Sequence, residues 1–109
     1  MNFIVETSDV AQAEIEAAFL RLSAYDPEFA GRWLEGLTRA IESLQTLPRR
    51  HERVSSEGAA GRETRRMLYR NGRTVYRIIF ILIDADDDGE EETVRVLQVR
   101  SAAQSQEKG

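Results

Sequence analysis

The sequence contains no cysteine and only one histidine among its 109 residues, and just one of its basic residues is a lysine. Without cysteine there is no disulfide framework and no thiolate metal site. The N-terminus does not combine a basic region with a long apolar core, as a secretory signal would. The longest apolar run is too short for a membrane-spanning helix, which needs about 20 residues. We therefore expect one cytoplasmic domain with no membrane contact, no cofactor and no bound metal.

Charge is unevenly distributed along the chain, although the net charge is only −4. Residues 1–48 carry eight acids and three arginines, whereas residues 49–77 carry nine arginines and three acids. Residues 84–92 carry seven acids and no base. The central arginines predict either a surface that binds nucleic acid or a solvated, partly salt-bridged face.

The segment Thr74–Ile83 (TVYRIIFILI) is the only long apolar run, and it is rich in β-branched and aromatic residues. Both faces of such a strand would be apolar, which predicts a central strand covered on both sides. Arg77 interrupts this pattern. Because an unpaired buried charge is costly, Arg77 is expected at an open end of the strand or in a functional role.

Two helices are predicted before this strand. Ser8 or Asp9 can cap a helix that ends near Ala24, with apolar positions at helical spacing. Asp26 and Pro27 suit the start of a second helix, which Pro48 would end at about Leu47. Its apolar face is predicted to comprise Phe29, Trp33, Leu37, Ile41 (or Ala40), Leu44 and Leu47. A tight turn between these two helices predicts an antiparallel hairpin.

Strands are predicted on either side of the helices. Asn2–Glu6 is expected to form a short strand, and Arg49–Gly61 a mobile loop. Arg62–Tyr69 and Thr74–Ile83 would form a hairpin around Asn71-Gly72, since an Asn-Gly pair favours a tight turn. After an acidic loop, Asp84–Glu92, the last strand is Thr93–Arg100. The order β-α-α-β-β-β predicts an α+β fold: a meander of three antiparallel strands, joined at one edge by the first strand and covered on one face by the helical hairpin.

This order and four sequence features resemble the RelE/ParE family, the toxins of bacterial type II toxin–antitoxin modules. The resemblance covers about residues 3–100. Its motifs are PEFA and LQTLP in the helical hairpin, Arg66-Met67-Leu68, Tyr76–Phe80 (YRIIF) and Val94–Arg100 (VRVLQVR). It implies a toxin domain over residues 1–100, and the polar composition of residues 101–109 predicts a disordered tail. It also implies a cognate antitoxin that neutralises the toxin and lays a helix or an extended segment on the sheet or the hairpin.

Two activities occur in the family. ParE-like members inhibit DNA gyrase, and RelE-like members cut messenger RNA in the ribosome. For the nuclease, the resemblance implies that Arg77 and a residue of the preceding strand, Arg65 or Arg66, bind phosphate. For the inhibitor, Arg65, Arg66, Arg77 and Arg100 would be charged anchors for the target.

The sequence lacks residues that RelE-like nucleases often carry, and this favours the ParE-like inhibitor. Cleavage of RNA without metal needs groups that move protons, and arginine stays protonated. RelE-like nucleases often carry a tyrosine on a C-terminal helix and a further basic residue after the last strand, and neither is visible here. We expect a ParE-like inhibitor, with a RelE-like endonuclease or an inactive antitoxin-binding relative as alternatives.

Three further features, an EF-hand-like segment, His51 and Trp33, are not expected to have a functional role. Asp84–Gly89 matches the first half of an EF-hand loop, but Arg95 occupies the position of its bidentate glutamate. Calcium binding is therefore not expected. His51 is expected to be solvated in its loop, and Trp33 is expected in the core.

Overall fold

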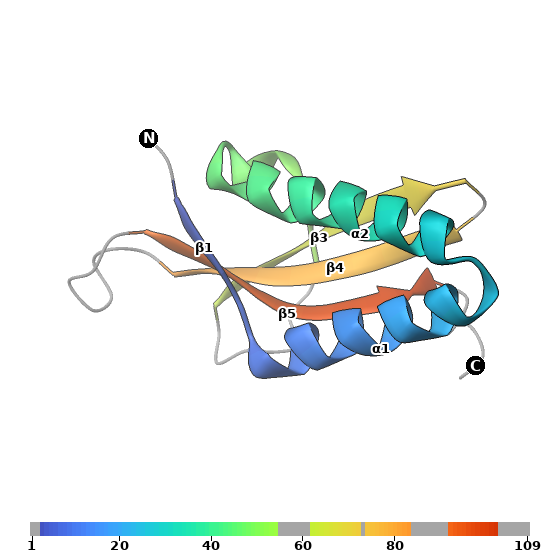
Figure 1. The fold of residues 1–109 in the computed structure, drawn as a ribbon. Coiled ribbons are helices and arrows are strands. Elements are labelled where there is room, and N and C mark those ends of the chain that lie inside the picture. The colour runs from blue at the N-terminus through green and yellow to red at the C-terminus, as the bar shows by residue number, and fades with distance from the viewer. Residues whose placement is uncertain (1–2, 55–61, 73, 84–91, 103–109) are drawn as a thin grey trace.

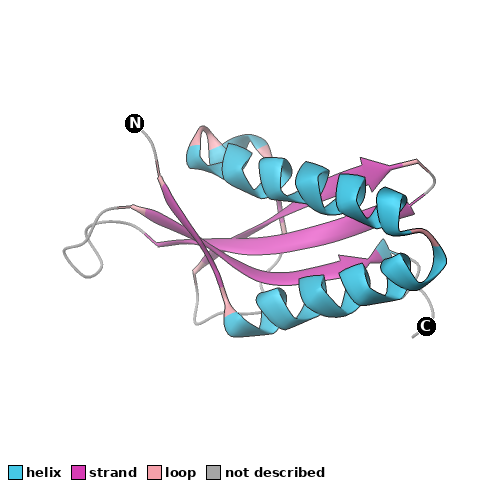
Figure 2. Cartoon of the chain, viewed as in Figure 1, coloured by secondary structure: helices cyan, strands magenta, loops and turns pink. Residues whose placement is uncertain are grey.

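The structure is a computed structural model, and it describes residues 3–54, 62–72, 74–83 and 92–102. Two helices lie on one face of a five-stranded sheet (Figures 1 and 2). The elements are β1 (Ile4–Thr7), α1 (Asp9–Tyr25), α2 (Pro27–Glu42), the 3-10 helices η1 (Ser43–Gln45) and η2 (Pro48–Arg50), β2 (Glu52–Arg53), β3 (Glu63–Asn71), β4 (Thr74–Ile83) and β5 (Thr93–Ser101).

The sheet has the strand order β1-β5-β4-β3-β2, so β4 is central as predicted. The strands β3, β4 and β5 form an antiparallel meander, and β1 pairs in parallel with β5. This confirms the α+β class and the β-α-α-β-β-β order. At the predicted Asn71-Gly72 turn, Gly72 has φ +65°, a left-handed conformation that glycine adopts at low cost.

Both helices begin at the residues that the sequence indicates. The Ser8 hydroxyl caps α1 by accepting a hydrogen bond from Ala11 N at 3.1 Å. The Asp26 carboxylate caps α2 through Phe29 N at 3.2 Å, and Pro27 occupies the first turn. These caps satisfy N–H groups that have no partner within a helix. They also fix the tight turn that folds α2 back against α1.

The prediction that α2 continues to about Leu47 is wrong. The α-helix ends at Glu42, and η1 takes the chain through Leu44, which is buried. Leu47 has φ +50° and is 66% exposed, so it does not belong to the buried face. The 3-10 turn rotates the chain off the helical period, and Pro48 disfavours a right-handed helical conformation at Leu47.

The prediction of a mobile loop over Arg49–Gly61 is also wrong in its first half, which contains regular structure. The helix η2 comes first, and β2 then adds a fifth strand. A hydrogen bond of 2.9 Å from Val54 N to Thr64 O continues this pairing. A strand of two residues has no visible period, so sequence patterns do not reveal it. Residues 55–61, Asp84–Glu91 and 103–109 lie outside the described residues, as do the EF-hand-like segment and most of the predicted tail.

The core lies between the helices and one face of the sheet. From β4, Tyr76, Ile78, Phe80 and Leu82 point toward the helices and are buried. Trp33 of α2 is fully buried and contacts Tyr76, with ring centroids 5.1 Å apart. No helix among the described residues is long and apolar enough to cross a membrane.

Close contact between α2 and β3 depends on a glycine. A Cβ atom at Gly36 would lie 2.2 Å from the hydroxyl oxygen of Tyr69. That hydroxyl donates a hydrogen bond of 3.0 Å to the carbonyl oxygen of Trp33. The contact fixes which face of β3 points toward the helices. Tyr69 and Met67 lie on the helix side, so Arg66, Leu68 and Arg70 lie on the opposite side.

Candidate functional site

The face of the sheet opposite the helices carries a concentration of arginines, which we call the arginine face. It is formed by alternate residues of the three long strands, because side chains alternate between faces. Its arginines are Arg66, Arg70, Arg77, Arg95 and Arg100, as the strand registers place them. The sequence alone left open whether Arg65 or Arg66 shares a face with Arg77. The register shows that it is Arg66.

Arg77 lies in the middle of this face. Its cross-strand neighbours are Leu68 on β3 and Arg100 on β5. Arg77 and Arg100 therefore place like charges directly opposite each other, an arrangement that lowers the stability of a sheet. Glu14 of α1 offsets part of it, because its carboxylate forms an ion pair of 2.8 Å with Arg100. No ion pair or side-chain hydrogen bond joins Arg77 to another described residue. Its partial exposure leaves it available to bind an anion.

A carboxylate lies at the border of the arginine face. Glu52 of β2 pairs across the sheet with Arg66, and their side chains form an ion pair of 2.5 Å. The Nε atom of Arg66 is buried and has no hydrogen-bond partner among the described residues. Sequence reasoning missed Glu52, because nothing in its sequence context indicates that the chain enters the sheet there. Arg70 was missed too, although alternation with Arg66 places it on the same face.

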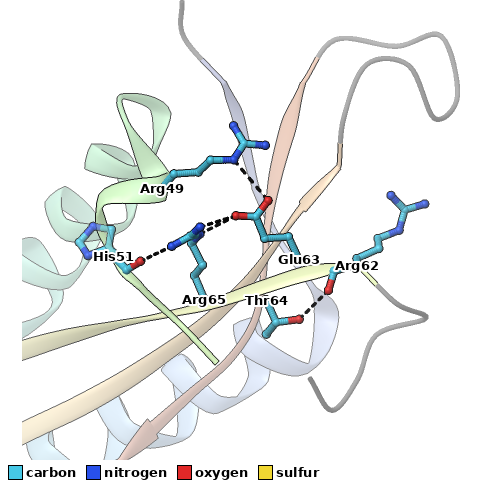
Figure 3. Close-up of polar contacts among 6 residues, drawn as sticks. All are labelled: Arg49, His51, Arg62, Glu63, Thr64 and Arg65. Atoms are coloured by element: carbon cyan, nitrogen blue, oxygen red, sulfur yellow. Dashed lines mark hydrogen bonds and ion pairs between the residues drawn. The ribbon is translucent and has the colours of Figure 1, made fainter. Parts of the chain in front are cut away.

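Arg65 lies on the opposite side of β3, in a separate polar cluster (Figure 3). Its guanidinium donates to Glu63, with a distance of 2.6 Å between Nη2 and Oε2, and to the carbonyl oxygen of His51 at 2.6 Å. Arg49 also contacts Glu63, at 3.3 Å. On the other side of the strand, the Thr64 hydroxyl donates to the Arg62 carbonyl (Figure 3). In this arrangement Arg65 anchors the segment around His51 to β3 and does not face Arg77.

His51 is half-buried and lies against the core, so it is less solvated than predicted. Its ring meets that of Phe80 edge-on, with centroids 6.0 Å apart. Burial lowers the pKa of His51 below 6.5, and Arg50 and Arg65 lower it further. Burial raises the pKa of Glu63, but the hydrogen bonds and charges of Arg65 and Arg49 outweigh this effect and hold it below 4.5. At neutral pH the cluster therefore contains a neutral imidazole and an ionised carboxylate.

These shifts predict how stability depends on pH. Both groups have a lower pKa in the folded chain than in the unfolded chain, so the unfolded chain binds protons first as the pH falls. We expect the free energy of unfolding, measured by urea titration, to decrease below pH 6.5 and again below pH 4.5. His51→Gln should remove the first decrease and Glu63→Gln the second. A profile that the His51 variant leaves unchanged would contradict this account.

The arginine face is equipped to bind, and it has little capacity to move protons. Guanidinium groups pair in a planar, bidentate manner with phosphate or carboxylate, and they do not titrate near neutral pH. Three carboxylates contact arginines of this face: Glu52 pairs with Arg66, Glu6 with Arg95 and Glu14 with Arg100. His51, the chain's one histidine, lies with Arg65 on the other side of β3. No group of acidic or histidine residues within the described part of the chain could hold a metal ion.

Comparison with known proteins gives a likeness in fold. No family model matches the chain, and no curated protein matches its sequence. The chain is similar to a chain of the chromosomal ParDE TA system from P. aeruginosa, with a TM-score of 0.66 and 15% sequence identity. The match covers 91% of this chain and 95% of that chain. The two proteins therefore share one fold over nearly their whole lengths.

Proposed function

We propose that this protein is the toxin of a type II toxin–antitoxin module and that it acts as a ParE-like inhibitor of DNA gyrase. One observation carries the proposal: the fold of a chain from a ParDE system extends over 91% of this sequence. The motif Tyr76–Phe80 forms the central strand β4, and Val94–Arg100 lies within β5. The polypeptide encoded next to this chain would then be its antitoxin.

The arginine face supports inhibition by binding. Arg77 and Arg70 have no ion pair within the described residues, and they lie on a surface that lacks a histidine in that part of the chain. Such a surface suits an acidic protein surface or a nucleic-acid backbone. Arginine is also enriched among the residues that contribute most to binding at protein interfaces. Inhibition requires binding alone, so the absence of an evident acid–base pair is compatible with this function.

The test is a supercoiling assay with purified gyrase and relaxed plasmid. We expect the wild-type chain to inhibit supercoiling, and an added antitoxin, taken as the product of the adjacent gene, to restore it. The chain should also arrest growth when it is expressed alone. Growth arrest without any effect on gyrase would exclude the ParE-like target. The absence of growth arrest at good expression would favour the inactive antitoxin-binding relative.

A RelE-like endonuclease is the second candidate, and one contact favours it. Glu52 lies 2.5 Å from Arg66, on the same face as Arg77, so a carboxylate that could accept a proton adjoins the phosphate-binding arginines. Cleavage of messenger RNA at the ribosomal A site, lost in Glu52→Gln and retained in Glu63→Gln, would establish this activity in place of gyrase inhibition.

A further inference from the structure

The arginines at the rim of the arginine face each bind a carboxylate of this chain, whereas those in its middle do not. The carboxylates come from β2, β1 and α1, and the pairs are Arg66 with Glu52, Arg95 with Glu6 and Arg100 with Glu14. No ion pair or side-chain hydrogen bond within the described residues involves Arg70 or Arg77. Among the three paired arginines, Arg100 is the one that lies directly opposite Arg77.

Glu14 reaches the β5 edge because α1 is fastened to it. Just after β1 ends, the Ser8 backbone N–H donates a hydrogen bond of 2.9 Å to Val96 O. Ala11 and Ala18 are buried, and their small side chains allow α1 to lie close to the sheet. Glu14 follows Ala11 by three residues and precedes Ala18 by four, which places it on the same face of the helix. Its carboxylate is therefore held beside β5.

The Glu14 carboxylate is divided between two partners on β5. One oxygen accepts a hydrogen bond of 2.8 Å from Val99 N, and the other lies 2.8 Å from the Nε atom of Arg100. The first contact pairs a backbone group at the edge of the sheet. The second holds the guanidinium group of Arg100 at that edge and neutralises its charge. The Glu14 side chain is 22% exposed and that of Arg100 is 50% exposed, so a ligand can still reach the arginine.

Arg77 and Arg100 together form a place where a carboxylate could bind. They are directly opposite each other on neighbouring strands, and the Cβ atoms of such residues lie about 5 Å apart. An anion between two guanidinium groups would relieve their repulsion and accept hydrogen bonds from both. Glu14 opposes this in two ways, because its charge repels the anion and its oxygen occupies the Nε–H of Arg100. A ligand that engages both arginines must therefore displace Glu14.

We propose that Glu14 is an internal competitor for the target of the arginine face. Its carboxylate holds Arg100 at the sheet edge, and carboxylates of an acidic protein surface must displace it before Arg77 and Arg100 can bind together. The rim of the face favours a carboxylate ligand over a phosphate, because each of its pairs joins an arginine to a carboxylate. That the ligand belongs to the toxin's target rests on the proposed function, whereas the competition rests on the contacts of Glu14.

The experiment titrates the full chain, labelled with ¹⁵N, with citrate as a carboxylate probe that cannot pair as a strand. Citrate should shift the Nε–H resonances of Arg77 and Arg100. Glu14→Gln keeps an oxygen for Val99 N and loses the charge, so it should bind citrate about two- to fivefold more tightly than the wild-type chain. A residue with only a structural role would leave the affinity unchanged or lower it. Unchanged or weaker binding by folded Glu14→Gln overturns the proposal.

Two comparisons isolate the contact between Glu14 and Arg100. In an Arg100→Met background, the gain from Glu14→Gln should fall below about twofold, because the two changes act on one contact. Glu6→Gln removes the equivalent ion pair of Arg95, which lies four residues along the sheet from Arg77, roughly 13 Å away. Since salt screens exposed charges over such a distance, it should change the affinity by less than about twofold. An equal gain in Glu6→Gln, or a full gain without Arg100, contradicts the proposal.

A short single-stranded oligonucleotide tests the class of ligand. Its phosphates offer the same charge as citrate in a different geometry, and we expect the wild-type chain and Glu14→Gln to differ most in their affinity for citrate. A gain for the oligonucleotide without a gain for citrate would overturn the assignment to an acidic protein surface.

Supercoiling assays separate this inference from the proposed function. If both hold, Glu14→Gln should inhibit gyrase at an about two- to fivefold lower concentration than the wild-type chain. A wild-type chain without effect on gyrase loses the proposed function, and the citrate titration still decides the role of Glu14. A chain that inhibits gyrase equally well with and without the Glu14 charge keeps its proposed function and loses this inference.

Discussion

Replacing Trp33 with alanine is expected to lower the free energy of unfolding by about 3–5 kcal/mol. Trp33 is fully buried at the centre of the core, between α2 and the sheet, where its ring contacts Tyr76. Truncation removes most of the side chain's apolar burial and leaves a cavity that the rigid sheet cannot close. Since domains of this size are stable by about 5–15 kcal/mol, the loss is a large share of the total. Urea unfolding followed by circular dichroism measures it.

Two matched variants serve as controls for Trp33→Ala. Leu20→Ala removes a side chain of α1 that is 65% exposed, and it should change stability by less than about 0.5 kcal/mol. Trp33→Phe should cost less than the alanine change, because it keeps an aromatic ring. It also removes the indole N–H, which is buried and has no hydrogen-bond partner among the described residues. If Trp33→Ala proved no more costly than Leu20→Ala, the assignment of Trp33 to the core would be wrong.

On the proposed function, reversing the charge at Arg77 is expected to abolish growth arrest while the fold persists. Arg77 is partly exposed and opposes Arg100, so glutamate at this position would relieve a like-charge pair instead of breaking an ion pair. If Arg77 is an anchor for the target, its loss should weaken binding by about 2 kcal/mol or more, roughly 30-fold. Colony counts after induction of Arg77→Glu measure the loss of toxicity, and thermal unfolding checks the fold.

The control for Arg77 is a charge reversal elsewhere on the surface. Arg21 is exposed on α1, away from the arginine face, so Arg21→Glu should retain full toxicity. Arg65→Met gives a second contrast, because Arg65 anchors His51 and Glu63 on the other side of β3. It should reduce stability more than Arg77→Glu does. If Arg77→Glu stays fully toxic at equal expression, Arg77 is not an anchor for the target.

Much of the fold could be predicted because local signals and tertiary structure agree. Ser8, Asp26 and Pro27 specify helix starts through hydrogen bonds and φ preferences that act within a few residues. The apolar run Thr74–Ile83 predicts a central strand, and the structure places it there. The end of α2 was predicted less well, because the switch to a 3-10 turn at Ser43 satisfies the core contact of Leu44 without continuing the helical period.

The candidate site could be predicted only in part, because it depends on register. Alternation separates Arg65 from Arg66, but sequence alone does not say which of them points toward the helices. The contact of Tyr69 with Trp33 and Gly36 decides it. Glu52 joins the arginine face through a strand of two residues, and Glu14 reaches Arg100 from a helix distant in sequence. Such contacts leave no periodic trace in the sequence.

The parallel pairing of β1 with β5 has a consequence for the timing of folding. Val5 pairs with Val94, so the sheet brings together segments from near the two ends of this sequence. While β5 is still being synthesised, β1 has no neighbour in the sheet and β4 lacks one of its two partners. At about 5–20 residues per second, residues 8–92 alone take several seconds to synthesise. The complete five-stranded sheet can therefore form only after β5 has been made, several seconds after β1.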